Sequence, residues 1–160
     1  MTELRLRHAA RAVVLDPDDR ILLVRFEFPE RIVWATPGGG LDDGETHEQA
    51  IVRELEEEAG VTELELGPWI WTRTHVFPFE SGLWDGQVER YVLVRSPAFE
   101  PVPRFSAEQL AAEYVTGIRW WTQEELADAH GVIFAPRRLP ELVAALLRDG
   151  PPGEPLDVGV

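Results

Sequence analysis

RELEEEAG, residues 53–60, crowds four glutamates and one arginine into little more than two helical turns. The preceding residues predict the helix that carries them. Thr46 and Gln49 have the spacing of a capping box, and Gly60 is typical of a helix C-terminal cap. Apolar residues recur every four positions in between, at Ile51, Leu55 and Ala59. The sequence therefore predicts an amphipathic helix from Thr46 to Ala59.

The four glutamates do not share one side of this helix. At 100° per residue, Glu54, Glu57 and Glu58 fall on a face roughly 100° wide beside the apolar stripe, whereas Glu56 points away. Arg53 lies one turn before Glu57 and forms an i,i+4 pair with it. Like charges at these spacings cost about 0.2–0.5 kcal/mol per pair, which a stable domain tolerates. A solvated acidic face with one salt bridge is therefore the simplest interpretation of the helix alone.

The segment before the helix favours a second interpretation. PGGGLDDGE, residues 37–45, contains glycines that permit close backbone approach and positive φ angles. Three carboxylates on one helix face, next to such a loop, are the oxygen ligands that Mg²⁺ or Mn²⁺ prefers when it bridges to substrate phosphates. A calcium-binding EF-hand is excluded, because the loop lacks carboxylates at alternate positions and a closing bidentate glutamate.

The stretch from Gly39 to Val61 resembles the Nudix box, the signature of the Nudix (MutT-like) hydrolases. The matching positions are Gly39, Glu45, Arg53, Glu54, Leu55, Glu57, Glu58, Gly60 and Val61, all at the family's spacing. The order of the flanking strands and the late segment RWWTQEEL are also similar to the family. The resemblance implies an α/β/α sandwich with a mixed central sheet. It also implies hydrolysis of a nucleoside diphosphate linked to another group.

The resemblance further implies roles for individual residues. Glu54, Glu57 and Glu58 would bind Mg²⁺ (or Mn²⁺), joined by the backbone carbonyl of Gly38, and Glu45 and Arg53 would brace the loop against the helix. The proton of the attacking water would go to a glutamate, either Glu54 or the Glu57–Glu58 pair, or one on a later loop. A fourth acidic ligand is expected from Glu113 first, with Glu108 and Glu89 as the other candidates. The family's acidic position before RWW is occupied here by Thr116-Gly117.

Substrate contacts are expected from Arg25, at the end of the strand ILLVRF, and from Gly39 and Gly40. One aromatic ring is expected to stack on the nucleobase of the substrate. Trp34 is the preferred candidate, and the others are Phe26, Phe28, Trp69, Trp71 and Trp84. His75 is expected to be a partly buried strand histidine. Pro78 lies seventeen positions after the box, which weakly favours ADP-ribose or a nucleotide sugar. The alternatives are a housecleaning (d)NTP pyrophosphatase and a non-catalytic nucleotide-sensing module, although such modules usually lose a box glutamate.

Composition limits the partners. The 160 residues carry a formal net charge of −14, which argues against a broad grip on nucleic acid or on anionic lipid. There is no cysteine, so thiolate chemistry is excluded, and no apolar run approaches the length of a membrane span. We therefore expect a cytoplasmic protein that acts on a small nucleotide. The oligomeric state stays open, with a homodimer as one option.

The rest of the chain predicts one domain over residues 1–149 and a flexible tail over 150–160. Strands are expected at 10–15, 21–26, 32–36, within 63–78, at 86–96 and at 117–122. Further helices are expected from Thr122 and over 139–150. Because the strands are interleaved with helices without regular βαβ repetition, a mixed sheet with helices on both faces is expected.

Overall fold

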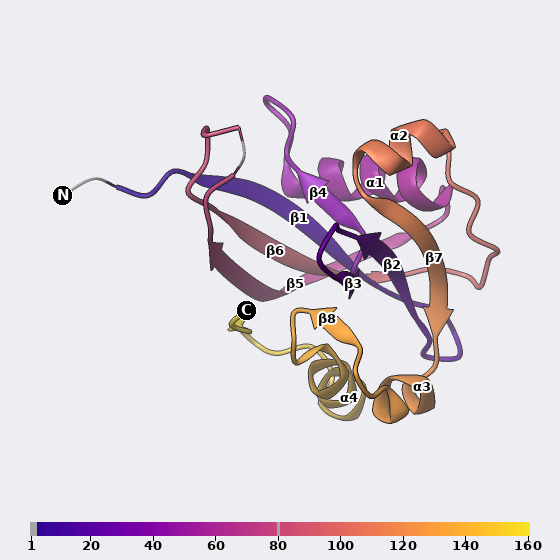
Figure 1. Ribbon diagram of the computed structural model, residues 1–160. Coiled ribbons are helices and arrows are strands. Elements are labelled where there is room, and N and C mark those ends of the chain that lie inside the picture. The colour runs from indigo at the N-terminus through magenta and orange to yellow at the C-terminus, as the bar shows by residue number, and fades with distance from the viewer. Residues whose placement is uncertain (1–2, 80) are drawn as a thin grey trace.

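The computed structural model describes residues 3–79 and 81–160, and Figure 1 shows its arrangement. The helices are α1 (His47–Ala59), α2 (Ala107–Ala112), α3 (Gln123–Asp128) and α4 (Leu139–Asp149). The strands are β1 (Leu6–Leu15), β2 (Ile21–Glu27), β3 (Ile32–Ala35), β4 (Gly38–Gly40), β5 (Glu65–Val76), β6 (Gly86–Arg95), β7 (Val115–Trp121), β8 (Ile133–Ala135) and β9 (Leu156–Asp157). No helix in these two ranges is long and apolar enough to cross a membrane.

The strands form one mixed sheet in the order β8-β3-β2-β1-β6-β5-β9, with β4 paired to β1 and β7 paired to β2. The β1–β6, β3–β8 and β5–β9 pairs are parallel and the other pairs are antiparallel. Figure 1 shows α1 and α2 on one side of the sheet and α3 and α4 on the other. The predicted fold, a mixed sheet with helices on both faces, is therefore confirmed.

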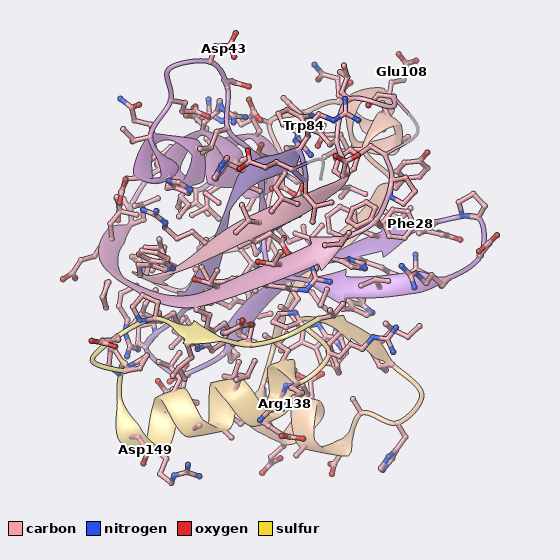
Figure 2. All side chains as sticks on the ribbon, turned by 90° about the vertical axis from the view of Figure 1, so that its left-hand side faces the viewer. Phe28, Asp43, Trp84, Glu108, Arg138 and Asp149 are labelled. Atoms are coloured by element: carbon pink, nitrogen blue, oxygen red, sulfur yellow. The ribbon has the colours of Figure 1, made fainter. Side chains whose placement is uncertain are left out.

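Two apolar cores hold these layers together. On one face, Ile51 and Leu55 of α1 pack against Ala12 and Val14 of β1. On the other face, the buried side of α4 packs against sheet residues that include Trp71, Tyr91 and Trp121. Figure 2 shows α4, with Arg138 and Asp149 labelled, below the sheet and the loop of Asp43 on the opposite side. Because β1 contributes alternate residues to both cores, it is the central strand against which the site is built.

The helix α1 has the ends that the sequence predicts. Thr46 Oγ1 accepts a hydrogen bond from the Gln49 backbone N–H at 3.1 Å, and Gln49 Oε1 accepts one from the Thr46 N–H at 2.9 Å. Gly60 adopts a left-handed conformation, with φ of 72°, and its N–H caps the last turn. These caps fix where the helix begins and ends, and thus which carboxylates face the sheet.

Three features differ from the sequence expectations. Gly38–Gly40, expected as a loop, forms strand β4, because its backbone pairs with Ala9–Arg11 of β1. The short elements α2 and β8 are additional. The tail over 150–160 is not detached: β9 pairs with Trp71 and Thr72 of β5, and Val158 is buried in the core beside α4. Three isolated aliphatic residues, Leu156, Val158 and Val160, among prolines, glycines and acids were too weak a signal to predict that docking.

Candidate acidic site

Glu58 occupies the innermost position of the acidic face of α1. It is 2% exposed, and its Oε1 accepts a hydrogen bond from the Gly38 N–H at 2.9 Å. Burial, and then the negative charge of Glu54, hold the pKa of Glu58 well above its ordinary value. A buried carboxylate beside another carboxylate is electrostatically costly unless a cation lies nearby. The helix therefore places its most costly charge where a positive ligand would stabilise it most.

Arg53 is the cation that the chain itself supplies. Its Nε and Nη2 each bind a Glu45 oxygen at 2.8 Å, and its Nη1 binds Glu54 at 3.0 Å and Glu57 at 3.2 Å. Nη2 also donates to the carbonyl of Gly40 at 3.1 Å. The hydrogen bonds from Arg53 hold the pKa of Glu45 at about 2. The expected contact between Glu45 and Arg53 is therefore present, and it ties the loop before α1 to both the helix and β4.

Strand β4 passes so close to the carboxylates that a side chain would not fit there. A Cβ atom added to Gly39 would lie 2.6 Å from Glu54 Oε1, closer than real Cβ contacts come. Gly38 has a φ of 141°, and a Cβ there would collide with the backbone of β1. Glycine at these positions allows the carboxylate of Glu54, which is 7% exposed, to lie directly against the strand.

The other side of β4 is held by a buried ion cluster on β1, β5 and β6. Arg11 Nε binds Glu89 at 2.6 Å, and Arg73 pairs with the other oxygen of Glu89. Arg11 Nη1 donates to the carbonyl of Gly38 at 3.0 Å. Burial acts to raise the pKa of Glu89, but the charges of Arg11 and Arg73 outweigh it and lower that pKa. The Gly38 carbonyl, which is expected to bind the metal ion, thus already accepts one hydrogen bond. Its second lone pair is left for the metal ion.

The candidates for a fourth acidic ligand lie in different places. Glu89, paired with two arginines, is not available as an unpaired ligand. Glu108 is exposed in the first turn of α2. Glu113 caps the other end of α2, and its pKa is raised by partial burial and then by the negative charge of Glu54, which places it within electrostatic range of the α1 carboxylates. Of the three, Glu113 is the one whose charge is coupled to the acidic face.

The acidic face offers oxygen donors rather than a finished metal site. Burial, and then the charge of Glu54, raise the pKa of Glu57 as well. Within the described ranges, no group of three acidic or histidine side chains is close enough to hold a metal ion as it stands. Arg53 Nη1 donates to both Glu54 and Glu57. In type and number these carboxylates fit a hard divalent cation.

The substrate contacts expected from sequence are more scattered. Arg25 binds Thr116 Oγ1 at 2.6 Å and pairs with Glu27 at 3.0 Å. Trp34 packs edge-on against Trp121, on the side of the sheet covered by α4. Of the other ring candidates, Trp71 is 1% exposed, so it cannot stack on a substrate base. His75 is half-buried on β5, as expected for a strand histidine.

Two arginines of the site were missed by the sequence interpretation. Arg11 and Arg7 lie on β1, far from the box in the chain, and the register of β1 with β4 places them beside Gly38 and Gly40. The only available signal was their spacing: residues four apart in a strand share a face. That signal became readable only once β4 was known to pair with β1.

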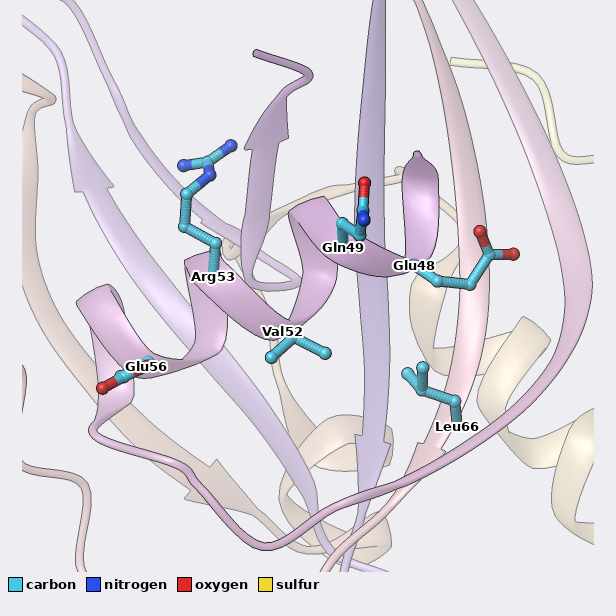
Figure 3. Close-up of a pocket in the computed structure, with 6 residues that line it drawn as sticks. All are labelled: Glu48, Gln49, Val52, Arg53, Glu56 and Leu66. Atoms are coloured by element: carbon cyan, nitrogen blue, oxygen red, sulfur yellow. The ribbon is translucent and has the colours of Figure 1, made fainter. Parts of the chain in front are cut away.

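A separate depression of about 490 Å³ lies on the outer side of α1 (Figure 3). Its lining consists of Glu48, Gln49, Val52, Arg53, Glu56 and Leu66. It shares only Arg53 with the acidic face, and Glu56 instead pairs with Arg104 at 3.4 Å. The expectation that Glu56 points away from the other glutamates is confirmed, and this depression is not where the carboxylates converge.

The fold and the site define an α/β protein in which a capped helix presents an acidic face to a three-glycine strand. A sequence model of the NUDIX domain matches residues 5–142, so the chain belongs to the NUDIX family. It is 35% identical over 105 residues to an RNA pyrophosphohydrolase of Helicobacter pylori, covering 59% of this chain and 66% of that protein. It is also 35% identical over 63 residues to an 8-oxo-dGTP diphosphatase of Proteus vulgaris, covering 38% of this chain and 56% of that protein.

A solved structure extends the likeness to the fold. The NUDIX domain of Shewanella oneidensis NrtR, complexed with ADP ribose, superimposes with a TM-score of 0.62 at 17% identity, covering 92% of this chain and 89% of that one. The matched regions of the curated relatives are shorter, between 43% and 66% of the length of those proteins. The family expected from the box is therefore confirmed.

Proposed function

We propose that this protein is a divalent-cation-dependent hydrolase that cleaves the phosphoanhydride bond of a nucleoside diphosphate derivative. The observation that carries the proposal is the convergence of Glu54, Glu57 and Glu58 on one face of α1, against a strand that carries no side chains. Without a bound cation, the repulsion between these carboxylates would destabilise the fold. A bound Mg²⁺ would neutralise their charge and remove that repulsion.

Three carboxylates would hold the metal ion: Glu54, Glu57 and Glu58, with the Gly38 carbonyl as a further oxygen donor. A bound Mg²⁺ neutralises diphosphate charge and lowers the pKa of water that it binds. Arg53 keeps Glu54 and Glu57 close together, and its bond to Glu45 holds the loop before α1 in place. The side chains thus have two tasks: they position the oxygen ligands of the metal ion, and they remove a proton from the attacking water.

Glu57 is the best placed of the three to accept the proton of the attacking water. Its side chain is 25% exposed, whereas those of Glu54 and Glu58 are almost fully covered. Arg53 binds Oε2 of Glu57, which leaves Oε1 to take the proton. Glu113 is the second candidate for this role, because its charge is coupled to the same carboxylates.

The substrate is proposed at the level of its chemistry, a nucleoside attached through a phosphoanhydride. ADP-ribose or a nucleotide sugar is favoured first, from the position of Pro78 in the sequence, and a (d)NTP is the alternative. The relatives named for RNA give a specific reason to include a 5′-triphosphorylated RNA end as a further candidate. The net charge of −14 disfavours long RNA, because most of its phosphates would gain no counter-charge.

The test is a substrate panel with Mg²⁺: ADP-ribose, a nucleotide sugar, a dinucleoside polyphosphate, dNTPs and a 5′-triphosphorylated oligoribonucleotide. Glu57→Gln removes the proposed base with little change in volume. Glu56→Gln is its matched control, because it makes the same chemical change one residue away on the outward side of α1. We expect Glu57→Gln to lose at least 10²-fold in kcat and Glu56→Gln to keep wild-type rates.

If no compound is turned over, the protein is a binding module on this fold and the hydrolase assignment is wrong. If Glu57→Gln and Glu56→Gln lose activity equally, the effect is one of charge rather than of chemistry, and the role of Glu57 is wrong.

A further inference from the structure

Arg7 lies directly against strand β4, on the side away from Glu54. A Cβ atom added to Gly40 would come closer than 3.0 Å to Nε, Cζ and Nη2 of the Arg7 guanidinium. One residue earlier, a Cβ on Gly39 would meet the Glu54 carboxylate instead. Successive strand residues face opposite sides. Arg7 and Glu54 are therefore separated by the thickness of a single glycine strand.

Among the residues that the structure describes, the guanidinium of Arg7 has no carboxylate at ion-pair distance. Its one side-chain hydrogen bond among residues 3–79 and 81–160 goes from Nη1 to Gln87 Oε1 at 3.3 Å. By contrast, Arg11 and Arg53 are each paired with carboxylates. Burial, and then the positive charge of Arg11, lower the pKa of Arg7. An anion at this place would regain the free energy lost by that burial.

Aromatic side chains continue the surface beyond the guanidinium. The Phe79 ring centroid lies 6.0 Å from Arg7 Cζ, and Phe77 stacks on Phe79 with centroids 4.9 Å apart and planes 15° from parallel. His75 follows at 4.5 Å from Phe77. An anionic group held by Arg7 would thus lie between the acidic face of α1 and the stacked rings. This arrangement suits a nucleotide, whose phosphate would bind Arg7 and whose base would contact the rings.

We propose that Arg7 binds a phosphate oxygen of the nucleotide, with the nucleoside directed toward Phe79 and Phe77. The inference rests on the proposed function only in taking the ligand to be a nucleotide. It assigns Arg7 a charged contact to the phosphate, in addition to the substrate contacts expected from Arg25, Gly39 and Gly40.

AMP and adenosine are the probes, measured by isothermal titration calorimetry in Mg²⁺ buffer. AMP contains no phosphoanhydride bond, so it survives whether or not the protein is a hydrolase.

Arg7→Gln removes the charge and keeps most of the side-chain length. Gly40→Ala leaves Arg7 in the chain but displaces its guanidinium, and the backbone of Gly40 is not in the left-handed region, so alanine is tolerated there. Arg148→Gln is the matched control, because Arg148 is exposed on α4 and pairs with its neighbour Asp149.

We expect the wild type to bind AMP at least tenfold more tightly than adenosine. Arg7→Gln should lower AMP affinity by about 10- to 100-fold, the value of a hydrogen bond to a charged group, while adenosine affinity changes less than twofold. Gly40→Ala should shift AMP affinity in the same direction, and Arg148→Gln should change neither. On the substrate found by the panel, Arg7→Gln should raise KM more than it lowers kcat.

Three results would overturn the inference: unchanged AMP affinity in Arg7→Gln, an equal loss for adenosine and AMP, or no AMP binding to the wild type. A negative hydrolysis panel together with Arg7-dependent AMP binding removes the proposed catalysis and leaves this site standing. Melting curves by circular dichroism establish that each variant is folded before its affinity is compared.

Discussion

Gly39→Ala perturbs the acidic site without touching any acidic residue. The new Cβ would lie 2.6 Å from Glu54 Oε1, whereas real contacts begin at 3.0 Å and are ordinary from 3.4 Å. The carboxylate must therefore retreat by roughly 0.4–0.8 Å, which pulls it away from Arg53 Nη1, now at 3.0 Å. Because a misplacement of about 1 Å in an active site costs on the order of 10²-fold in rate, we expect kcat/KM to fall about 10- to 100-fold.

The fold should survive this change. Gly39 is not in the left-handed region, so alanine fits its backbone and removes some entropy from the unfolded chain, worth about 0.4–1 kcal/mol. The weakened bond between Arg53 and Glu54 costs about 1.5–3 kcal/mol in the other direction. We therefore expect the melting temperature to fall by no more than about 10 °C.

The assay pairs kcat/KM with Mn²⁺ affinity, measured from the free-ion signal in electron paramagnetic resonance, which reports the site without turnover. Gly153→Ala is the control, because a Cβ at Gly153 meets open space. If Gly39→Ala keeps both kcat/KM and Mn²⁺ affinity within twofold of the wild type, the close approach of β4 to Glu54 has no functional consequence and the reasoning fails.

Three further outcomes follow from the same contacts. Arg53 holds the pKa of Glu45 at about 2, so ionised Glu45 stabilises the fold at pH values above its unfolded pKa near 4.5. That contribution is lost as the pH falls from about 4.5 to 2. The difference in unfolding free energy between the wild type and Glu45→Gln, measured by urea titration, should therefore shrink over that pH window. Glu89→Gln leaves Arg11 and Arg73 without their shared counter-charge and should cost about 3–5 kcal/mol by the same measurement, whereas a loss below 1 kcal/mol would contradict the pairing of buried Glu89. Val158→Ala should cost about 1.5–3 kcal/mol because it removes two buried methyl groups, and a value near zero would restore the interpretation of a detached tail.

The sequence predicted the helix α1 closely because every signal for it is local. The capping residues Thr46 and Gln49, the four-residue apolar repeat and Gly60 all lie within fifteen positions of one another. Each acts through the backbone of its own helix, so no tertiary contact is needed to interpret it. The contact between Glu45 and Arg53 was predictable for a different reason, since it came with the family resemblance of the box.

Features that depend on long-range pairing were not predictable in this way. Gly38–Gly40 contains no strand-forming residue, and it is a strand only because β1 offers it backbone partners. Arg7 and Arg11 became part of the site through that same pairing. β9 likewise exists because β5 has a free position at Trp71 and Thr72. In each case the information lies in the partner strand, which a local pattern does not contain.

The glycine strand explains how residues of opposite charge can be gathered so densely. Gly38 donates its N–H to Glu58 and accepts Arg11 at its carbonyl, while the carbonyl of Gly40 accepts Arg53. These three backbone groups thus contact charged side chains, and the absence of Cβ atoms lets a carboxylate approach from one face and a guanidinium from the other. Any side chain in β4 would widen this separation and weaken the attraction across it, because Coulomb energy falls with distance. Glu54, Glu58 and the arginines of β1 therefore depend on the same three glycines, and a substitution in β4 perturbs both the acidic and the basic side chains at once.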